Sequence, residues 1–284
     1  MTQKNLKTYE REEKYMEIKK IYELINLQPE IVKKMNECEK NVDLDELDDN
    51  LNRLITWETA KEAYQELKMR LGEDEGNLKM LYCQLECARR TYENYQKMNI
   101  SEKIFADTMK CYSRFIDECQ EKNGWMFCDR AWWTYRQLSM QIFRIGDLEY
   151  QFLKHGDEDA MAVHIPSDAI FTREAVDESL RLAGEFFATY YPDYKYTKYT
   201  CDSWLLSQEL KKFLPENSKI LDFQRRFEIL EEHKDKMEFI EWLFQRLEDT
   251  DYSELPEKTS LQRKVKESLL HGGKIGEAYG VFEH

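Results

Sequence analysis

His164 is the residue whose type and position best suit acid–base chemistry. It lies in the run 161–165, where the side chains alternate in size and polarity up to Pro166, as they do in a β-strand with two different faces. The alternation places His164 on the face opposite to Val163 and Ile165. A neutral imidazole at a strand end can accept a proton near pH 7. His164 is therefore a candidate general base, and a hydrogen-bonded structural histidine is the alternative.

A second group of reactive side chains follows the β-rich run 195–201, namely Cys201, Asp202 and Ser203. A thiol or hydroxyl at a strand end can act as a nucleophile when a base contacts it. The neighbouring sequence supplies no such base. Asp202 and Ser203 equally suit the capping of the next turn, with Trp204 packed beneath it, so both interpretations stay open.

The segment 166–172 joins the first strand to a long amphipathic helix over 172–190. Free backbone N–H groups and the helix dipole at such a helix start attract an anion such as a phosphate, and Arg173 adds a positive charge. However, the loop contains no glycine to admit a pyrophosphate, and Asp168 would repel one. An ordinary capped turn between strand and helix is the alternative.

All these groups belong to one strand–helix–strand unit, 160–206. The alternating run 148–152 precedes it, and together with 161–165 it predicts an antiparallel hairpin. In α/β folds the strand ends and the helix start of such a unit surround a crevice that often binds a ligand. The sequence therefore predicts a crevice where the two strands of the unit end.

The first 127 residues have the periodicity of an all-helical domain, because apolar residues recur at i, i+3 and i+4 spacings. Expected helices there cover 9–27, 29–38, 56–72 with Thr56 as the N-cap, 75–98 and 101–122. Farther along, we expect a helix over 127–142, with a continuous strand as the alternative. A short helix after Ser207, a strand over 226–230, helices over 235–247 and 259–270, and a last segment, 278–282, along a sheet edge should follow.

Two clusters suggest metal ligands, but their spacing argues against a metal site. Cys83 and Cys87 are one turn apart, whereas Cys111 and Cys119 are separated by eight residues, or about 12 Å along a helix. That separation is too long for one tetrahedral site, so buried free thiols are expected. The acidic run 43–49 lacks the glycine and the late glutamate of a calcium loop, and it predicts a solvated helix face.

The composition restricts the class of protein. The chain has 284 residues, a net charge of −14 and no basic stripe, so nucleic acid is not expected as a partner. No apolar run reaches the roughly 18–20 residues of a membrane span, and the N-terminus has no signal-peptide core. Seven cysteines without a framework spacing predict reduced thiols in a cytoplasmic protein.

Several phrases of the sequence resemble a bacterial family of acyltransferase domain-containing proteins, which have a helical N-terminal domain and a GNAT-like C-terminal domain. The order of predicted elements after residue 148 is also similar to the second half of a GNAT fold. The resemblance extends from about Tyr92 onward. The matching phrases are 105–109, 143–150, 163–166, Ser179, 186–187, 191–192, 201–206 and 276–280.

The resemblance implies an α+β fold, with a helical domain over 1–125 and a GNAT-like mixed α/β sheet domain over 126–284. It implies acyl-CoA or acetyl-CoA as co-substrate, no metal, and a small-molecule or peptide amine as acceptor. The strand carrying Val163 and Ile165 would hold the pantetheine arm, and Ser167, Thr172 and Arg173 would lie at the pyrophosphate. The usual Arg/Gln-x-x-Gly-x-Gly/Ala loop is absent from this chain.

The first functional hypothesis is a cytoplasmic N-acyltransferase in which an amine attacks the thioester directly. His164, or Glu149 on the neighbouring strand, would be the base, and Ser203 or Tyr199 would protonate the leaving thiolate. The second hypothesis is a non-catalytic GNAT-like binding module that has lost the pyrophosphate loop. A helical adaptor with an unrelated α+β domain is the third.

Overall fold

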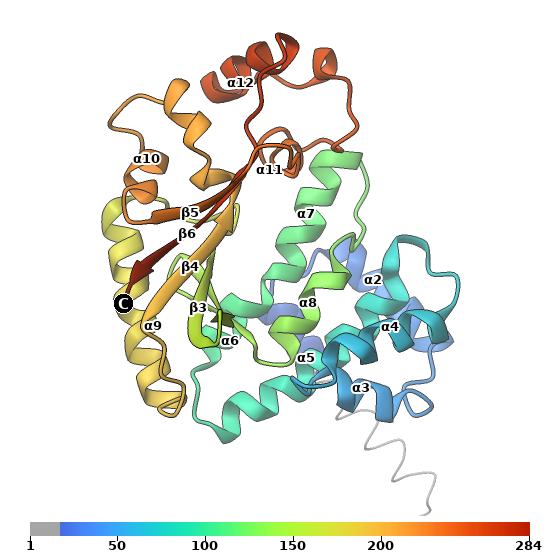
Figure 1. The fold of residues 1–284 in the computed structure, drawn as a ribbon. Coiled ribbons are helices and arrows are strands. Elements are labelled where there is room, and N and C mark those ends of the chain that lie inside the picture. The colour runs from blue at the N-terminus through green and yellow to red at the C-terminus, as the bar shows by residue number, and fades with distance from the viewer. Residues whose placement is uncertain (1–17) are drawn as a thin grey trace, which may run out of the picture. The chain divides into compact units, whose positions relative to one another are not determined.

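The computed structural model describes residues 18–284 and divides the chain into two compact units, one ending at Phe143 and one formed by Arg144–His284 (Figure 1). This division falls later than the predicted boundary at 125/126, because helix α8 (Ala131–Leu138) belongs to the first unit. Two buried side chains of α5 (Leu78–Lys97) hold both ends of α8. Gln84 donates to the carbonyl of Ala131 over 2.9 Å, and Thr91 donates to that of Leu138 over 2.7 Å.

The secondary structure of the first unit is helical from residue 18 to the end of α8, as predicted. Its elements are a helical segment at 18–24, α2 (Pro29–Asn41), α3 (Asp48–Leu54), α4 (Ala60–Leu71), the 3₁₀ turn η1 (Glu75–Asn77), α5, α6 (Glu102–Met109), α7 (Cys111–Asn123) and α8. Residues 9–17 of the first predicted helix lie outside the described residues. Thr59 rather than Thr56 precedes α4. The single helix predicted over 101–122 is two helices, of which Ser101 caps the first and Gly124 ends the second.

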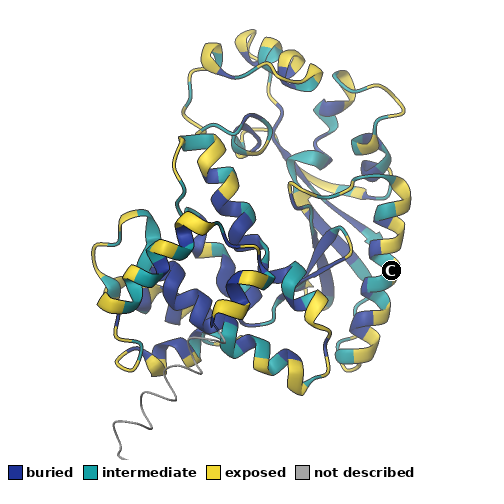
Figure 2. Cartoon of the chain, turned by 180° about the vertical axis from the view of Figure 1, so that it is seen from behind, coloured by how far each residue is buried: buried dark blue, intermediate teal, exposed yellow. Residues whose placement is uncertain are grey.

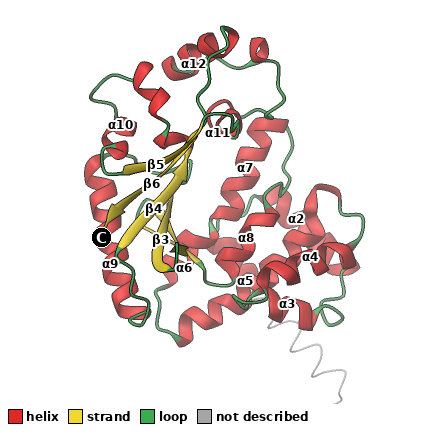
Figure 3. Ribbon diagram, viewed as in Figure 1, coloured by secondary structure: helices red, strands yellow, loops and turns green. Residues whose placement is uncertain are grey.

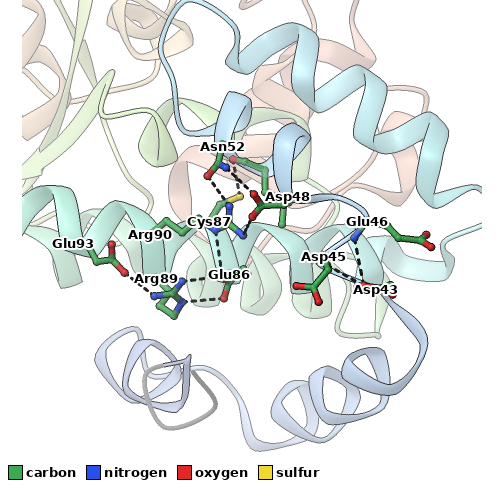
Figure 4. Close-up of polar contacts among 11 residues, drawn as sticks. Asp43, Asp45, Glu46, Asp48, Asn52, Glu86, Cys87, Arg89, Arg90 and Glu93 are labelled. Atoms are coloured by element: carbon green, nitrogen blue, oxygen red, sulfur yellow. Dashed lines mark hydrogen bonds and ion pairs between the residues drawn. The ribbon is translucent and has the colours of Figure 1, made fainter. Parts of the chain in front are cut away.

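The acidic run 43–49 forms a turn and the start of α3 (Figure 4). A carboxylate oxygen of Asp43 accepts hydrogen bonds from the backbone N–H of Asp45 over 3.0 Å and of Glu46 over 3.4 Å. Asp48 forms an ion pair with Arg90 of α5 over 2.9 Å, and Arg90 also contacts the buried carboxylate of Glu86 over 3.2 Å. These carboxylates therefore cap a turn and connect α3 to α5.

The seven cysteines are free thiols, and all except Cys38 are buried. Burial raises the pKa of Cys83 to about 12 and that of Cys87 well above its usual range, so both thiols stay protonated and contribute to packing. Within residues 18–284, no group of histidine, cysteine or acidic side chains could hold a metal ion. No helix in the same range is long and apolar enough to cross a membrane.

The second unit is built on a six-stranded mixed sheet with the order β1-β2-β3-β4-β6-β5 (Figure 3). Its strands are β1 (Ile142–Ile145), β2 (Leu148–His155), β3 (Glu158–His164), β4 (Lys198–Ser203), β5 (Glu228–His233) and β6 (Glu277–Glu283). The predicted hairpin of β2 and β3 is confirmed. The prediction that 278–282 lies along a sheet edge is wrong, because β6 pairs with β4 on one side and β5 on the other. Strand β1 begins at Ile142, the last residue of the helix predicted over 127–142, and α8 ends earlier, at Leu138.

Helix α9 (Arg173–Tyr190) covers one face of this sheet (Figure 1). The ring of Phe187 lies 6.4 Å from that of Tyr150 and 5.3 Å from that of Phe152, centroid to centroid. Ser179 fixes the helix to the β1–β2 turn, because its hydroxyl accepts from the backbone N–H of Leu148 and lies 2.9 Å from the hydroxyl of Tyr150. We call this the aromatic face of the sheet. In Figure 2 the strands are mostly buried, whereas helices alternate between buried and exposed residues.

The remaining helices form smaller clusters at the end of the second unit. They are η2 (Trp204–Leu206), η3 (Gln208–Lys212), α10 (Lys219–Gln224), α11 (Phe239–Phe244), η4 (Tyr252–Glu254) and α12 (Ser260–Leu270). Helix α10 was not predicted, and α11 is shorter than the predicted 235–247. Helix α12 begins as expected with a capping box between Thr259 and Gln262, and its buried side chains pack against those of α11.

Candidate functional site

The central feature of the second unit is the incomplete pairing of the parallel strands β3 and β4. They share only two register pairs, Met161 with Tyr199 and Ala162 with Thr200. Beyond these pairs, β3 continues to His164 on the side of β2, and β4 continues to Ser203 on the side of β6. Among the described residues, no register pair joins β3 to β4 past this point. The two strand ends thus have inner backbone edges without a partner strand, which an extended ligand chain can pair with.

The sheet presents two chemically different faces at this opening. Strand alternation places Val163 on the aromatic face, opposite Tyr150 in the register, and it is buried. The same alternation places His164 and Glu149 on the other face, which we call the polar face. Thr200 and Asp202 of β4 lie on this face as well. The sequence-based placement of His164 opposite to Val163 is therefore confirmed.

The structure brings together the two candidate bases, His164 and Glu149. They are directly opposed in the register of β2 and β3, and cross-strand neighbours have Cβ atoms about 4.5–5.5 Å apart. Glu149 is buried, and His164 is half-buried. Nε2 of His164 lies 2.9 Å from Oε1 of Gln151. With an amide oxygen as its partner, Nε2 carries the hydrogen, and the lone pair of the neutral ring is on Nδ1.

Tyr199, expected near the leaving group, is not brought together with His164. It lies on the aromatic face, stacked on Phe282 at 4.9 Å between ring centroids and 6.1 Å from Tyr150. Its hydroxyl is 3.1 Å from that of Tyr196. Burial, reinforced by Tyr196, raises the pKa of Tyr199 far above its usual range. The phenol is thus a protonated member of an aromatic cluster under α9.

Ser203 and Asp202 end β4, beside the opening. The hydroxyl of Ser203 accepts a hydrogen bond from the backbone N–H of Leu205 over 3.1 Å, and it therefore caps η2. Asp202 lies 3.4 Å from the ammonium of Lys236, which also contacts the buried carboxylate of Glu277 over 3.1 Å. Lys236 and Glu277 were not predicted at the site, because their distance in sequence from β4 hides their proximity.

The loop after β3 forms a turn that needs no glycine. The backbone N–H of Ala169 donates to the carbonyl of Pro166 over 3.1 Å, and no residue between Gly156 and Gln245 has a positive φ. The carboxylate of Asp168 is paired with Arg144 of β1 over 2.6 Å. The guanidinium therefore offsets the negative charge that was expected to repel a phosphate at this loop.

The expected phosphate-binding residues lie at the end of this loop and the start of α9. Ser167 is exposed in the turn. Thr172 is the N-cap of α9, and its hydroxyl accepts from the backbone N–H of Ala175 over 3.2 Å. Arg173, the first residue of the helix, forms an ion pair with Asp222 of α10. The helix start is thus capped as an ordinary turn, and an exposed arginine lies beside it.

Sequence reasoning missed two further residues of the polar face, His155 and Tyr279. Nδ1 of His155 lies 2.8 Å from the hydroxyl of Tyr279, and their rings are stacked at 5.8 Å. His155 is the last residue of β2, and Tyr279 lies in β6 opposite Asp202. The alternation of 277–283 could have indicated a polar-face tyrosine, but no local signal pairs it with a histidine 124 residues away.

Both halves of the chain match models of known protein families. Residues 142–282 match the family model described as the GNAT-like C-terminal domain, and residues 16–140 match that of the N-acyltransferase N-terminal domain. No curated protein sequence matches the chain significantly.

Solved structures of acyltransferases have a similar fold. One, in complex with decanoyl-CoA and teicoplanin, is 18% identical, with a TM-score of 0.70 over 94% of this chain and 99% of that chain. A second, in complex with decanoyl-CoA, is 19% identical, with a TM-score of 0.68 over the same shares of both chains. A third, in complex with CoA and 10C-teicoplanin, is 18% identical, with a TM-score of 0.70 and the same coverage.

The incomplete β3–β4 pairing, the sheet order and the two adjoining domain matches agree with one another. The predicted α+β class, a helical region followed by a GNAT-like mixed sheet, is confirmed. The chain belongs to the N-acyltransferases of GNAT-like type that carry a helical N-terminal domain.

Proposed function

We propose that this protein transfers an acyl group from acyl-CoA to an amine by direct attack of the amine on the thioester. The observation that carries the proposal is the opening between β3 and β4, which pair with each other at only two positions before they separate. An extended pantetheine arm can hydrogen-bond to the edge of β3 that faces the opening, as a strand would. Its thioester would then reach the polar face, where His164 and Glu149 are neighbours.

Five residues are proposed to hold the acyl-CoA. Val163 and Ile165 would offer backbone groups to the arm and to the oxyanion that forms at the carbonyl. Ser167, Thr172 and Arg173 lie in the turn and at the first residues of α9, where backbone N–H groups and the helix dipole favour the pyrophosphate. The pairing of Asp168 with Arg144 supports this path, and so does a turn that needs no glycine.

His164 is proposed as the base that removes a proton from the amine, because Gln151 orients its ring. Glu149 is the second candidate for this role, and it also supports a cationic imidazole after proton transfer. Ser203 remains a candidate donor to the thiolate, because a hydroxyl that accepts from Leu205 can still donate. Tyr199 lies on the opposite face and has no part in this arrangement.

The acceptor is proposed to be an amine on a small molecule or a peptide, and a similar acyltransferase solved in complex with decanoyl-CoA and teicoplanin supports this proposal. A cytoplasmic location fits the seven free thiols. A non-catalytic binding module would rest on the lost phosphate loop. The paired Asp168 and the unstrained turn both weaken that alternative.

The test is amine-dependent release of free CoA thiol. The protein is mixed with acyl-CoAs of increasing chain length and with a panel of small and peptide amines, and the amide product is identified by mass spectrometry. His164→Ala should lower kcat about 100-fold or more, with an unchanged melting temperature. His271→Ala is the matched control, because His271 is exposed after the end of α12 and its Nδ1 lies 2.8 Å from the carbonyl oxygen of Glu267, away from the proposed site. Thiol release that no amine accelerates would contradict the proposal.

A further inference from the structure

Tyr279 and His155 form a pair that spans the centre of the polar face. The Tyr279 hydroxyl lies 2.8 Å from Nδ1 of His155, and the two rings are stacked with an interplanar angle of 24°. Their strands, β6 and β2, are not neighbours, because β3 and β4 lie between them in the sheet. The contact must therefore be made across β3 and β4, the two strands whose pairing is incomplete.

Small side chains on β3 provide room for the two rings. Ala160 and Ala162 occupy the polar-face positions of β3 and are buried. On β4 the corresponding position is Thr200, which pairs with Ala162 in the last register pair before the opening. Burial raises the pKa of Tyr279, and the nearby Thr200 hydroxyl offsets part of that rise. The phenol is therefore protonated at neutral pH and passes close to the point where β3 and β4 separate.

We propose that Tyr279 is the catalytic proton donor to the leaving thiolate of CoA, and that His155 is a positioning residue that holds the phenol over the opening. The inference rests on the proposed acyl transfer. In that reaction the amine nitrogen forms a bond to the carbonyl carbon, and His164 takes one proton from the nitrogen. The carbon–sulfur bond breaks, and sulfur takes the phenolic proton. The phenolate then regains a proton from solvent, while imidazolium returns one to solvent, so that protons balance.

The geometry favours Tyr279 over the two donors expected from the sequence. Tyr199 lies on the aromatic face, away from His164. The hydroxyl of Ser203 is engaged by the N–H of Leu205 in a cap. Tyr279, in contrast, shares the polar face with His164, and the two side chains come from opposite sides of the opening, His164 from β3 and Tyr279 from β6.

The experiment compares leaving groups that do and do not need a proton. Wild type, Tyr279→Phe and Ser203→Ala are each assayed with an acyl-CoA and with the 4-nitrothiophenyl ester of the same acyl group, whose thiolate is stable without protonation. Tyr279→Phe should lower kcat with acyl-CoA about 100-fold or more, with little change in KM, while the rate with the nitrothiophenyl ester stays close to that of wild type. Ser203→Ala is the competing variant, and it should lower kcat with acyl-CoA less than Tyr279→Phe does.

Controls separate this role from a structural one. Tyr252→Phe, in η4 and outside the site, should match wild type with both esters. His155→Ala should lower kcat less than Tyr279→Phe does, and His155→Asn, which keeps a hydrogen-bonding group near Nδ1, should restore part of it. The melting-temperature shift by acyl-CoA should be equal in wild type and Tyr279→Phe.

The possible outcomes are distinct. Equal losses with both esters, or full activity of Tyr279→Phe with acyl-CoA, would overturn the assignment of Tyr279 while leaving acyl transfer intact. A Ser203→Ala variant that loses activity only with acyl-CoA would transfer the role to Ser203. A wild-type protein without amine-dependent turnover would overturn both the proposed function and this inference.

Discussion

Replacing Gln151 by glutamate tests the role of His164 with an almost isosteric change. Oε1 of Gln151 lies 2.9 Å from Nε2 of His164, so Gln151→Glu places a carboxylate beside the proposed base. The negative charge favours the imidazolium over the neutral ring. Less neutral base is then available at any given pH, and the rising limb of the pH–rate profile moves to higher pH.

The size of the pKa shift of His164 follows from its distance to the new carboxylate and from the exposure of the imidazole. Two unit charges at about 4 Å interact by roughly 4 kcal/mol at an effective dielectric constant of about 20, which is an upper bound for a half-buried imidazole. Opposite charges at such distances commonly shift a pKa by about 1–3 units. We expect the midpoint of the profile to rise by about 1–2 pH units, and the rate below that midpoint to fall about 10–100-fold.

The assay measures kcat/KM from pH 5.5 to 9.5 by thiol release, a range of about 4 units around the usual pKa of histidine. Gln151→Leu is the matched control, because it removes the hydrogen bond without adding charge, and its midpoint should not rise. Glu149→Gln removes the neighbouring carboxylate, and its pH profile of kcat/KM is measured in the same assay. An unmoved midpoint in Gln151→Glu, together with retained turnover in His164→Ala, would refute the assignment of His164 as the base.

Three further predictions concern the support of the site. Ser179→Ala leaves buried polar partners at the β1–β2 turn unsatisfied, and chemical denaturation should show a loss of about 2–4 kcal/mol; a loss under about 1 kcal/mol would contradict this, since one such group costs that much. Burial raises the pKa of Glu277 above its usual 4.5 despite Lys236, so wild type should lose stability relative to Glu277→Gln as the pH rises from 4.5 through the raised pKa. If the melting temperatures of wild type and Glu277→Gln change equally with pH from 4.5 to neutral, that result would argue against the burial cost. Arg144→Gln exposes the charge of Asp168 and should weaken acyl-CoA binding about tenfold, or 1.4 kcal/mol, by calorimetry; unchanged affinity would place the phosphates elsewhere.

The strand–helix–strand unit could be predicted from the sequence because its signals are local. Alternation marks β3, and Thr172 begins α9 where a capping residue was expected. Strand β1 was not found, because its four residues follow an amphipathic run that reads as a longer helix. The break between α6 and α7 at Lys110 also has no glycine or proline to signal it.

The site could be predicted only in part, because its remaining contacts are long-range. The position of His164 relative to Val163 follows from strand alternation alone. The insertion of β6 between β4 and β5 depends on pairing between segments far apart in the chain, and with it come Tyr279 and Glu277. The ion pair of Asp168 with Arg144, 24 residues away, likewise offsets the repulsion that was expected from the sequence of the loop alone.

The central claim is that the opening between β3 and β4 binds acyl-CoA, and the most direct measurement is the melting temperature with and without a panel of acyl-CoAs. At a concentration about 100 times the Kd, a bound ligand stabilises the folded protein by about 2.7 kcal/mol, which corresponds to an increase of roughly 5–10 °C for a chain of this size. The account predicts such an increase for at least one acyl-CoA. An unchanged melting temperature with every acyl-CoA at millimolar concentration would contradict it.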